Sequence, residues 1–284
     1  HAAACYITSA FILSVSWDRN LKIITLLTDF GEEDGYPAVM KGVIWGIAPE
    51  TQIADISHLV PPQDVMTGAR LLDRAAPFFP AGTVHIAVVD PGVGTTRRPI
   101  AARLGQHYFV APDNGLLTPL LDRAQRQNQT VEIVFLNQTR YWLPAVSSTF
   151  HGRDIFAPVG AALVNGVPLT SLGSVITDPQ RLEMPGITRT SSGWLGEVVH
   201  VDHFGNLATN IPADVLPASG RITVHVAGRA IGRLSATFGD GQPGELIAVI
   251  DSSNMLSIAV VNGSAHQATG ASLGGRVEVI HQSP

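Results

Sequence analysis

Cysteine and charge are both scarce in this chain of 284 residues, and each scarcity removes a class of protein. Cys5 is the single cysteine, so the chain has neither an intrachain disulfide framework nor a cysteine-based zinc site. The ten histidines do not fall in the H-E-x-x-H spacing or another tight ligand pattern, so the sequence predicts no metal centre. Charged residues make up 14% of the chain, the formal net charge is −5, and no basic run indicates binding to nucleic acid or to a membrane surface.

Two nucleotide-binding signatures are also missing. G-x-G-x-x-G does not follow the first predicted strand, which disfavours a Rossmann dehydrogenase, and the glycine loop at residues 89–98 lacks the P-loop spacing. The chain instead has 45% hydrophobic residues, 28 glycines and 19 prolines, a composition typical of a compact, loop-rich globular protein. Its length suits one large domain or two smaller ones.

The first twenty residues are mostly apolar between Cys5 and Trp17, but this run is too short to span a bilayer. No basic stretch precedes it and the chain does not begin with methionine, so a signal peptide is not asserted from the sequence. We predict that residues 1–20 are an N-terminal extension outside the functional core.

Short β-branched runs alternate with helical periodicity over residues 21–165. Strands are expected at residues 22–28, 52–56, 83–89, 107–111 and 131–136. Helices are expected at residues 39–47, 64–76 and 154–164. This alternation predicts an α/β N-terminal domain with a mostly parallel central sheet flanked by helices.

The chain changes character after residue 165. Proline, glycine, serine and threonine are frequent in residues 166–193, which predicts a linker. Residues 194–284 predict a smaller, all-β C-terminal domain, a barrel or sandwich, with short strands punctuated by glycine and asparagine. These strands are expected at residues 196–202, 221–226, 246–250, 256–261 and 276–280.

The loop at residues 89–98 carries the densest group of chemically useful side chains. It follows a predicted buried strand, and α/β folds place their ligand sites at the carboxyl ends of strands. A tight loop can bring Asp90 and Arg97 together as an ion pair. An exposed pair of this kind contributes about 0–1 kcal/mol, so the loop alone leaves a structural and a functional role equally open.

Three further clusters lie at predicted element boundaries. Asp29 ends the first strand and can either bind a ribose diol or cap a helix. His151 can act as a general base, although a single histidine is more often structural. Residues 202–206 and 251–254 combine carboxylate, amide and hydroxyl groups, with aromatic rings in the first, which suits a polar zwitterion beside a flat base, but each alone is typical of a turn.

Taken in order, seven segments resemble the S-adenosyl-L-methionine (SAM) hydroxide adenosyltransferases, the hydrolase relatives of fluorinase and chlorinase. The resemblance extends from about residue 22 to residue 280. The segments are residues 28–31, 55–58, 82–98, 112–117, 148–156, 204–206 and 256–259. Seven ordered matches are far more specific than any one of them.

The resemblance implies hydrolysis of SAM to adenosine and L-methionine, without a cofactor, by attack of water on the ribose C5′ in an SN2-type reaction. It implies a catalytic triad of Asp90, Arg97 and His151. The halogenating relatives carry Tyr where this chain has Asp90 and Tyr-Ser where it has His151-Gly152, so the chain resembles the members that use water. Which of Asp90 and His151 accepts the proton of the water is not decided by the sequence.

The same resemblance implies the substrate contacts. Asp29 would bind the ribose hydroxyls, Asn206 and Phe238 the adenine, and Asp202 and Ser252 the amino and carboxylate groups of methionine. The remaining expected contacts are Phe30, Asn114, Phe150, Phe204 and Gly263. Ser253 stands where the fluorinase-like pattern has arginine, which leaves the binding of the methionine carboxylate open.

The family resemblance also implies a homotrimer with each substrate between the N-terminal domain of one subunit and the C-terminal domain of its neighbour. A cytoplasmic location is expected because the substrate is intracellular, while the N-terminal extension leaves export open. No nucleic-acid or membrane partner is expected.

Two alternatives remain. A halide-using transferase would form 5′-halo-5′-deoxyadenosine, and Asp90 and His151 disfavour it. A non-catalytic SAM- or adenosine-binding protein would keep Asp29, Asn206 and Phe238 but would need no triad.

Overall fold

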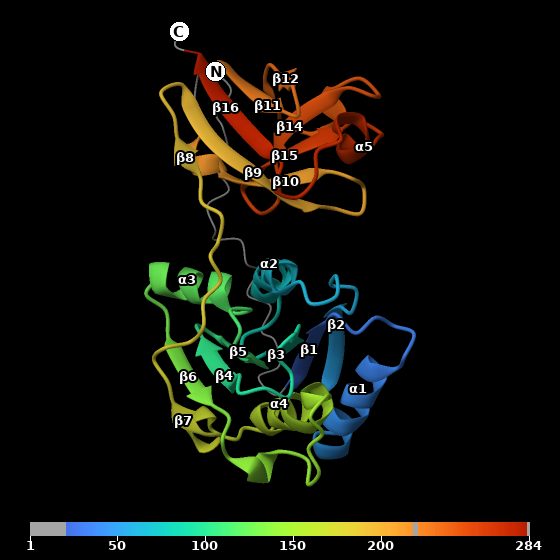
Figure 1. The fold of residues 1–284 in the computed structure, drawn as a ribbon, viewed down its shortest axis with the longest axis vertical. Helices are drawn as coiled ribbons and strands as arrows, with labels where there is room; N and C mark the ends of the chain where they lie inside the picture. The colour runs from blue at the N-terminus through green and yellow to red at the C-terminus, as the bar shows by residue number, and fades with distance from the viewer. Residues whose placement is uncertain (1–20, 218–220, 283–284) are drawn as a thin grey trace. The chain divides into compact units, whose positions relative to one another are not determined.

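The computed structural model describes residues 21–217 and 221–282, which form two compact units divided between Leu182 and Glu183 (Figure 1). The predicted extension at residues 1–20 lies outside the described residues. Each unit has its own sheet and its own hydrophobic core. No helix of the described segments is long and apolar enough to cross a membrane.

A seven-stranded sheet in the order β2-β1-β3-β5-β4-β6-β7 forms the centre of the N-terminal unit. Pairing is parallel from β2 through β1 and β3 to β5, and antiparallel from β5 through β4 and β6 to β7. The strands are β1 Ile23–Thr28, β2 Gln52–Ser57, β3 Val84–Val88, β4 Pro99–Leu104, β5 His107–Pro112, β6 Val131–Phe135 and β7 Ser174–Val175.

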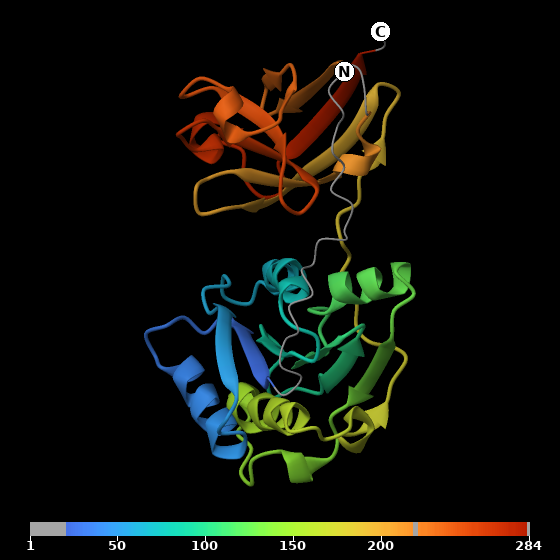
Figure 2. The ribbon, with the colours of Figure 1, turned by 180° about the vertical axis from the view of Figure 1, so that it is seen from behind.

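Helices cover both faces of this sheet, as Figure 2 shows from behind. The helices are α1 Tyr36–Ile47, α2 Val65–Ala75, α3 Thr118–Arg126 and α4 Ala157–Val164. β3 is buried along its whole length because its side chains alternate between two cores: Ile86 packs with α1 and α4, and Ala87 packs with α2 and α3. The α/β class predicted from the sequence is confirmed, with parallel pairing in one half of the sheet.

Helix boundaries follow local chemistry. Asp64 caps α2 by accepting a hydrogen bond from the Thr67 amide (2.9 Å), as is usual for an N-cap carboxylate. The helix expected from residue 154 begins earlier, as a π-helical turn over Gly152–Phe156 that continues into α4. Short 3₁₀ turns occur at Ala76–Phe78, Thr139–Tyr141, Leu169–Ser171, Ala213–Val215 and Phe238–Asp240.

The C-terminal unit is a nine-stranded sheet in the order β12-β11-β16-β9-β10-β15-β14-β13, with β8 beside β9, that curls into a nearly closed barrel. All its pairs are antiparallel except β13 with β14. The strand-rich domain predicted from the sequence is confirmed. Its elements are β8 Thr188–Arg189, β9 Gly193–Val201, β10 Leu207–Pro212, β11 Arg221–Val226, β12 Arg229–Ile231, β13 Leu234–Ser235, β14 Leu246–Ile250, β15 Met255–Val260, α5 Ala265–Thr269 and β16 Arg276–Gln282.

Residues 166–193, predicted as a linker, include two short strands. β7 pairs with β6 of the N-terminal unit, and β8 pairs with β9 of the C-terminal unit.

Candidate active site

The glycine loop leaves the carboxyl end of β3 and packs against the segment that leads to His151. Gly94 has a φ of +76°, in the left-handed region that favours glycine. A Cβ atom there would collide with the carbonyl oxygen of Ser148. Glycine is therefore required twice at this position, once for the backbone angle and once for the close approach of the two segments.

Asp90 and Arg97 form a buried ion pair within this loop. Arg97 Nε lies 2.9 Å from Asp90 Oδ1 and 3.0 Å from Oδ2, and Nη2 also donates to Oδ2. The Asp90 side chain is 4% exposed and that of Arg97 is 9% exposed. This burial excludes an ordinary surface pair. Two charges removed from water must be held in a fixed geometry to offset their desolvation.

Arg97 also joins His151 to the pair. Its Nη2 lies 3.0 Å from His151 Nδ1. A guanidinium group can only donate, so Nδ1 accepts and the proton of the neutral ring resides on Nε2. Burial lowers the pKa of His151, and so does the charge of Arg97, against the opposing effect of Asp90 and Asp154. His151 is therefore a neutral ring at physiological pH.

One nitrogen of the Arg97 guanidinium is left over. Nη1 is buried and has no hydrogen-bond partner within residues 21–217 and 221–282. The guanidinium carbon lies 5.2 Å from the centre of the Phe156 ring, in the π-helical turn that follows His151. The cluster thus presents a buried charged donor next to a carboxylate and an imidazole, an arrangement suited to binding a small oxygen nucleophile.

Aromatic rings pack beside this cluster. The Phe30 and Phe150 rings are 5.7 Å apart, and each also meets the Tyr36 ring edge-on, at 6.0 and 5.2 Å respectively. A Cβ atom at Gly152 would lie 3.2 Å from both phenylalanine rings. The structure therefore brings the candidates Phe30 and Phe150 together. Tyr36, which sequence reasoning missed, completes the group from the first turn of α1.

Asp29 and Asn114 lie at the carboxyl ends of β1 and β5. Asp29 Oδ2 accepts a hydrogen bond from the Gln63 amide (2.8 Å), and Gln63 itself has a φ of +64°. Asn114 Nδ2 donates to the carbonyl of Val89 (2.8 Å), the residue before Asp90. Asn114 thereby fixes the strand end from which the glycine loop departs.

In the C-terminal unit, Asp202, Phe204 and Asn206 share one turn between β9 and β10. Asp202 Oδ1 accepts from the amides of Phe204 (2.9 Å) and Asn206 (2.8 Å), while Oδ2 accepts from Asn206 Nδ2 (2.9 Å). Phe204 is 74% exposed, so its ring is available as a flat surface. Ser264, next to the candidate Gly263, packs so closely on Gly205 that a Cβ atom there would collide with it.

The other C-terminal candidates lie in separate turns. Phe238 is 54% exposed at the start of a 3₁₀ turn. Ser252 belongs to the β14–β15 turn, which Asp251 organises by accepting hydrogen bonds from the Ser253 amide (2.8 Å) and from Ser257 Oγ (3.0 Å).

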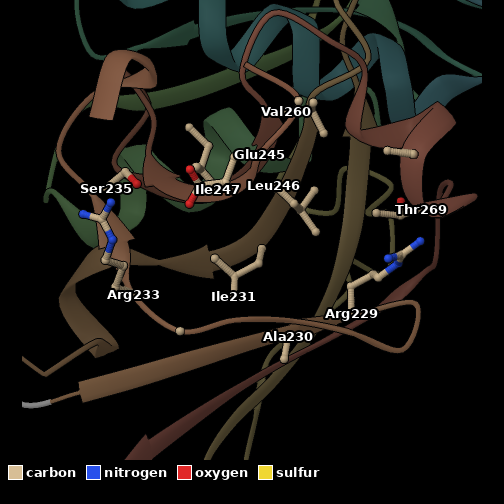
Figure 3. Close-up of a pocket in the computed structure, with 13 residues that line it drawn as sticks. Arg229, Ala230, Ile231, Arg233, Ser235, Glu245, Leu246, Ile247, Val260 and Thr269 are labelled. Carbon is tan, nitrogen blue, oxygen red and sulfur yellow. The ribbon is translucent and has the colours of Figure 1, made fainter. Parts of the chain in front are cut away.

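A cavity of about 700 Å³ lies elsewhere on this unit, between β12, β14 and α5 (Figure 3). Arg233 Nη2 in its lining donates to the Asp240 carbonyl (3.2 Å), and Glu245 accepts from the Gln242 amide (2.7 Å). The lining includes none of the candidate residues, and two of its charged groups are already engaged locally. The candidate active site is therefore the Asp90–Arg97–His151 cluster. Within the described ranges, no group of three or more His, Cys, Asp or Glu side chains is arranged to hold a metal ion.

Comparison with known proteins identifies the family. Residues 24–173 match the SAM hydroxide adenosyltransferase N-terminal domain, and residues 196–278 match the SAM hydroxide adenosyltransferase C-terminal domain. The chain belongs to the SAM hydroxide adenosyltransferase family, and the resemblance inferred from seven segments is confirmed.

Individual relatives agree with this assignment. The (R)-S-adenosyl-L-methionine hydrolase of Salinispora tropica is 44% identical over 262 residues, 90% of this chain and 97% of that protein. The enzyme of the same name from Thermus thermophilus is 38% identical over 270 residues, 92% of this chain and 100% of that protein. A fluorinase from an Actinoplanes species is 30% identical over 272 residues, 84% of this chain and 90% of that protein. A conserved protein from Thermotoga maritima has a crystal structure that superposes with a TM-score of 0.84 at 37% identity, covering 91% of this chain and all of that one.

Proposed function

We propose that this chain hydrolyses SAM to adenosine and L-methionine by attack of water on the ribose C5′. The observation that carries the proposal is the position of Arg97, which donates to both Asp90 and His151 at the carboxyl end of β3. The names of the hydrolase relatives specify the (R) epimer of the sulfonium, so (R)-SAM is the substrate we assign. A cytoplasmic location, where SAM is found, is part of the proposal.

The reaction balances without a cofactor. A bond forms between the water oxygen and C5′, the C5′–S bond breaks, and its electron pair neutralises the sulfonium. Methionine leaves as a neutral thioether, so the leaving group needs no acid. The difficulty lies with the nucleophile, because bulk water has a pKa of about 15.7 and must lose a proton as it attacks.

The hydrogen-bond directions support separate roles for the three triad residues. Arg97 Nη1 is the free donor that holds the attacking oxygen and stabilises its developing negative charge. His151 Nδ1 already accepts from Arg97, so the ring acts through its Nε2–H, which orients the water. Asp90, whose carboxylate keeps unused lone pairs, accepts the proton.

Substrate recognition is proposed to use both units. In the N-terminal unit, Asp29 binds the ribose hydroxyls, and Phe30 and Phe150 enclose the sugar. In the C-terminal unit, the contacts are made by Asp202, Phe204, Asn206, Phe238, Ser252 and Gly263. Because Ser253 replaces the arginine of the fluorinase-like pattern, we assign the methionine carboxylate to the serine hydroxyls and amides of the β14–β15 turn.

We further propose a homotrimer in which neighbouring subunits complete each site. The support is the division of candidate residues between the two units together with the family resemblance. Mixing Asp90→Asn with Asp202→Ala subunits tests it: sites built from two subunits regain activity on mixing, whereas sites within one subunit stay inactive.

The function is tested by incubating the protein with each sulfonium epimer of SAM in halide-free buffer, then with chloride or fluoride, and separating the nucleosides. We expect adenosine and methionine from the (R) epimer in every buffer. A halide-dependent 5′-halo nucleoside would identify a halogenating enzyme. Bound SAM without turnover would identify a binding protein and refute the mechanism.

A further inference from the structure

One segment of the family pattern, residues 55–58, has no part in the triad or in the proposed substrate contacts. His58 in this segment is buried, with 4% of its side chain exposed. Its Nδ1 lies 2.9 Å from Thr28 Oγ1 at the end of β1, and its Nε2 lies 3.0 Å from Asp55 Oδ1 in β2. Asp55 Oδ2 in turn accepts from Lys41 Nζ of α1 (2.5 Å). The four side chains link three elements of the N-terminal unit.

In this set of contacts, the Asp55 carboxylate is the final hydrogen-bond acceptor. Burial acts to raise the pKa of Asp55, but hydrogen bonds from Lys41 and His58 outweigh it, so the pKa lies below its usual value and the group is a carboxylate. A carboxylate only accepts, so His58 directs its Nε2–H toward it, across a contact less well aligned than a regular hydrogen bond. In the neutral ring with its proton on Nε2, Nδ1 accepts the hydroxyl proton of Thr28.

Thr28 and His58 also contact the segment that contains the candidate ribose-binding residues. Thr28 Oγ1, oriented by His58, accepts a hydrogen bond from the amide of Phe30 (3.2 Å). The carbonyl of His58 accepts from the amide of Gly31 (2.9 Å). Asp29 follows Thr28 and precedes the two anchored amides, so His58 holds the side chain before Asp29 and the backbone after it.

We propose that His58 is a positioning residue that holds Asp29 and Phe30 in the orientation needed to bind the ribose hydroxyls. The inference rests on the proposed function for its substrate. Asp55 and Lys41 serve His58 by fixing the orientation of its ring.

A second threonine–histidine pair on the same strand provides a matched control. Thr25 Oγ1 lies 2.7 Å from Nδ1 of His85, which is fully buried. His85 Nε2 has no hydrogen-bond partner among the residues that the structure describes, and the ring contacts Phe79 edge-on and stacks on Phe109. The His85 pair lies three residues earlier on β1 and has no contact of the kind that His58 makes with the Asp29 segment.

The experiment compares His58→Gln with His85→Gln in the full chain. The first readout is amide hydrogen exchange at Phe30 and Gly31, which requires no activity. We expect exchange about tenfold faster in His58→Gln, because the Thr28 hydroxyl and the carbonyl of residue 58 lose the ring that fixes their positions, and near wild-type exchange in His85→Gln. Unchanged exchange in His58→Gln would overturn the proposal.

The second readout is kcat/KM for SAM relative to its 2′-deoxy analogue. We expect His58→Gln to reduce this ratio about tenfold, mostly through KM, and His85→Gln to leave it unchanged. His58→Asn, which still accepts from Thr28, should restore part of the ratio. Added to Asp29→Ala, His58→Gln should change it no further. An equal loss for both substrates would show a merely structural role.

Asp55→Asn is a second variant for the case in which His58→Gln does not fold, and the same two shifts are expected. If the wild-type protein does not hydrolyse SAM, the proposed function fails, while hydrogen exchange still decides whether His58 positions the Asp29 segment.

Discussion

The two units organise their candidate residues in different ways. In the N-terminal unit, Asp90, Arg97 and His151 come from two loops and bond directly to one another. In the C-terminal unit, each candidate side chain lies in a local turn, and Asp202 bonds to the backbone of its own turn. The difference fits the proposed function, in which the first unit fixes the reacting groups and the second presents surfaces that the substrate contacts.

Replacing Arg97 should have the largest effect on turnover, because Arg97 connects the candidate residues of the N-terminal unit. Arg97→Lys keeps the charge but cannot bridge Asp90 and His151, so we expect kcat to fall about 10²–10³-fold while SAM binding persists. Steady-state kinetics and calorimetric binding measure the two effects. Arg98→Lys is the matched control, because Arg98 pairs with Asp113 and Asp178 outside the cluster. Wild-type turnover in Arg97→Lys would remove the residue from the mechanism.

Protonation of His151 has a smaller effect. The lowered pKa of His151 places the acidic limb of kcat/KM below pH 6.5, the ordinary histidine value. Activity falls as the pH drops through this limb, because a cationic ring can no longer accept from Arg97. His151→Gln should lower kcat about 10–100-fold and remove the limb. A limb that persists in His151→Gln would assign it to another group.

Removing the exposed Phe238 ring tests whether the C-terminal unit contributes to binding and not to the chemical step. Phe238→Ala should raise KM about tenfold with a smaller change in kcat, because it removes a binding surface and no reacting group. Phe78→Ala, at another exposed phenylalanine, should leave both constants unchanged. A loss confined to kcat would contradict a binding role for Phe238.

Acid should destabilise the N-terminal unit through His85. Burial, with a smaller contribution from His107, lowers the pKa of His85 to about 3. The unfolded chain protonates near pH 6.5, so between these values it binds the extra proton. Stability is therefore complete above about pH 6.5 and falls by about 1.4 kcal/mol per pH unit toward pH 3. Denaturant melts of wild type and His85→Gln should differ in this slope, and equal slopes would refute the assignment. His203→Gln, at an exposed histidine, should melt like wild type.

Periodicity predicted the elements whose apolar positions recur at the regular spacing of a strand or a helix. β1, β3 and α2 fall within one residue of their predicted bounds because their apolar positions repeat regularly. β4 and α3 were not predicted. β4 begins with Pro99 and carries Arg103, and α3 has Pro119 at its first turn and only a short apolar stripe.

The sequence indicated which residues belong to the candidate site, but not most of the hydrogen bonds between them. The pairing of Asp90 with Arg97 followed from one short loop. The contact of Arg97 with His151 spans 54 positions and depends on the fit of Gly94 against Ser148, which no local pattern encodes. The link from Thr28 to His58 depends on parallel pairing of β1 and β2 and was not predicted for the same reason.

The contact between the Arg97 loop and the His151 segment leaves no room for a side chain at Gly94. Because Gly94 has no Cβ atom, the loop that carries Arg97 can approach closely the segment that carries His151. A methyl group at that point would widen the separation between base, donor and ring without altering any of them. The geometry of the cluster is thus set in part by a residue that has no functional group.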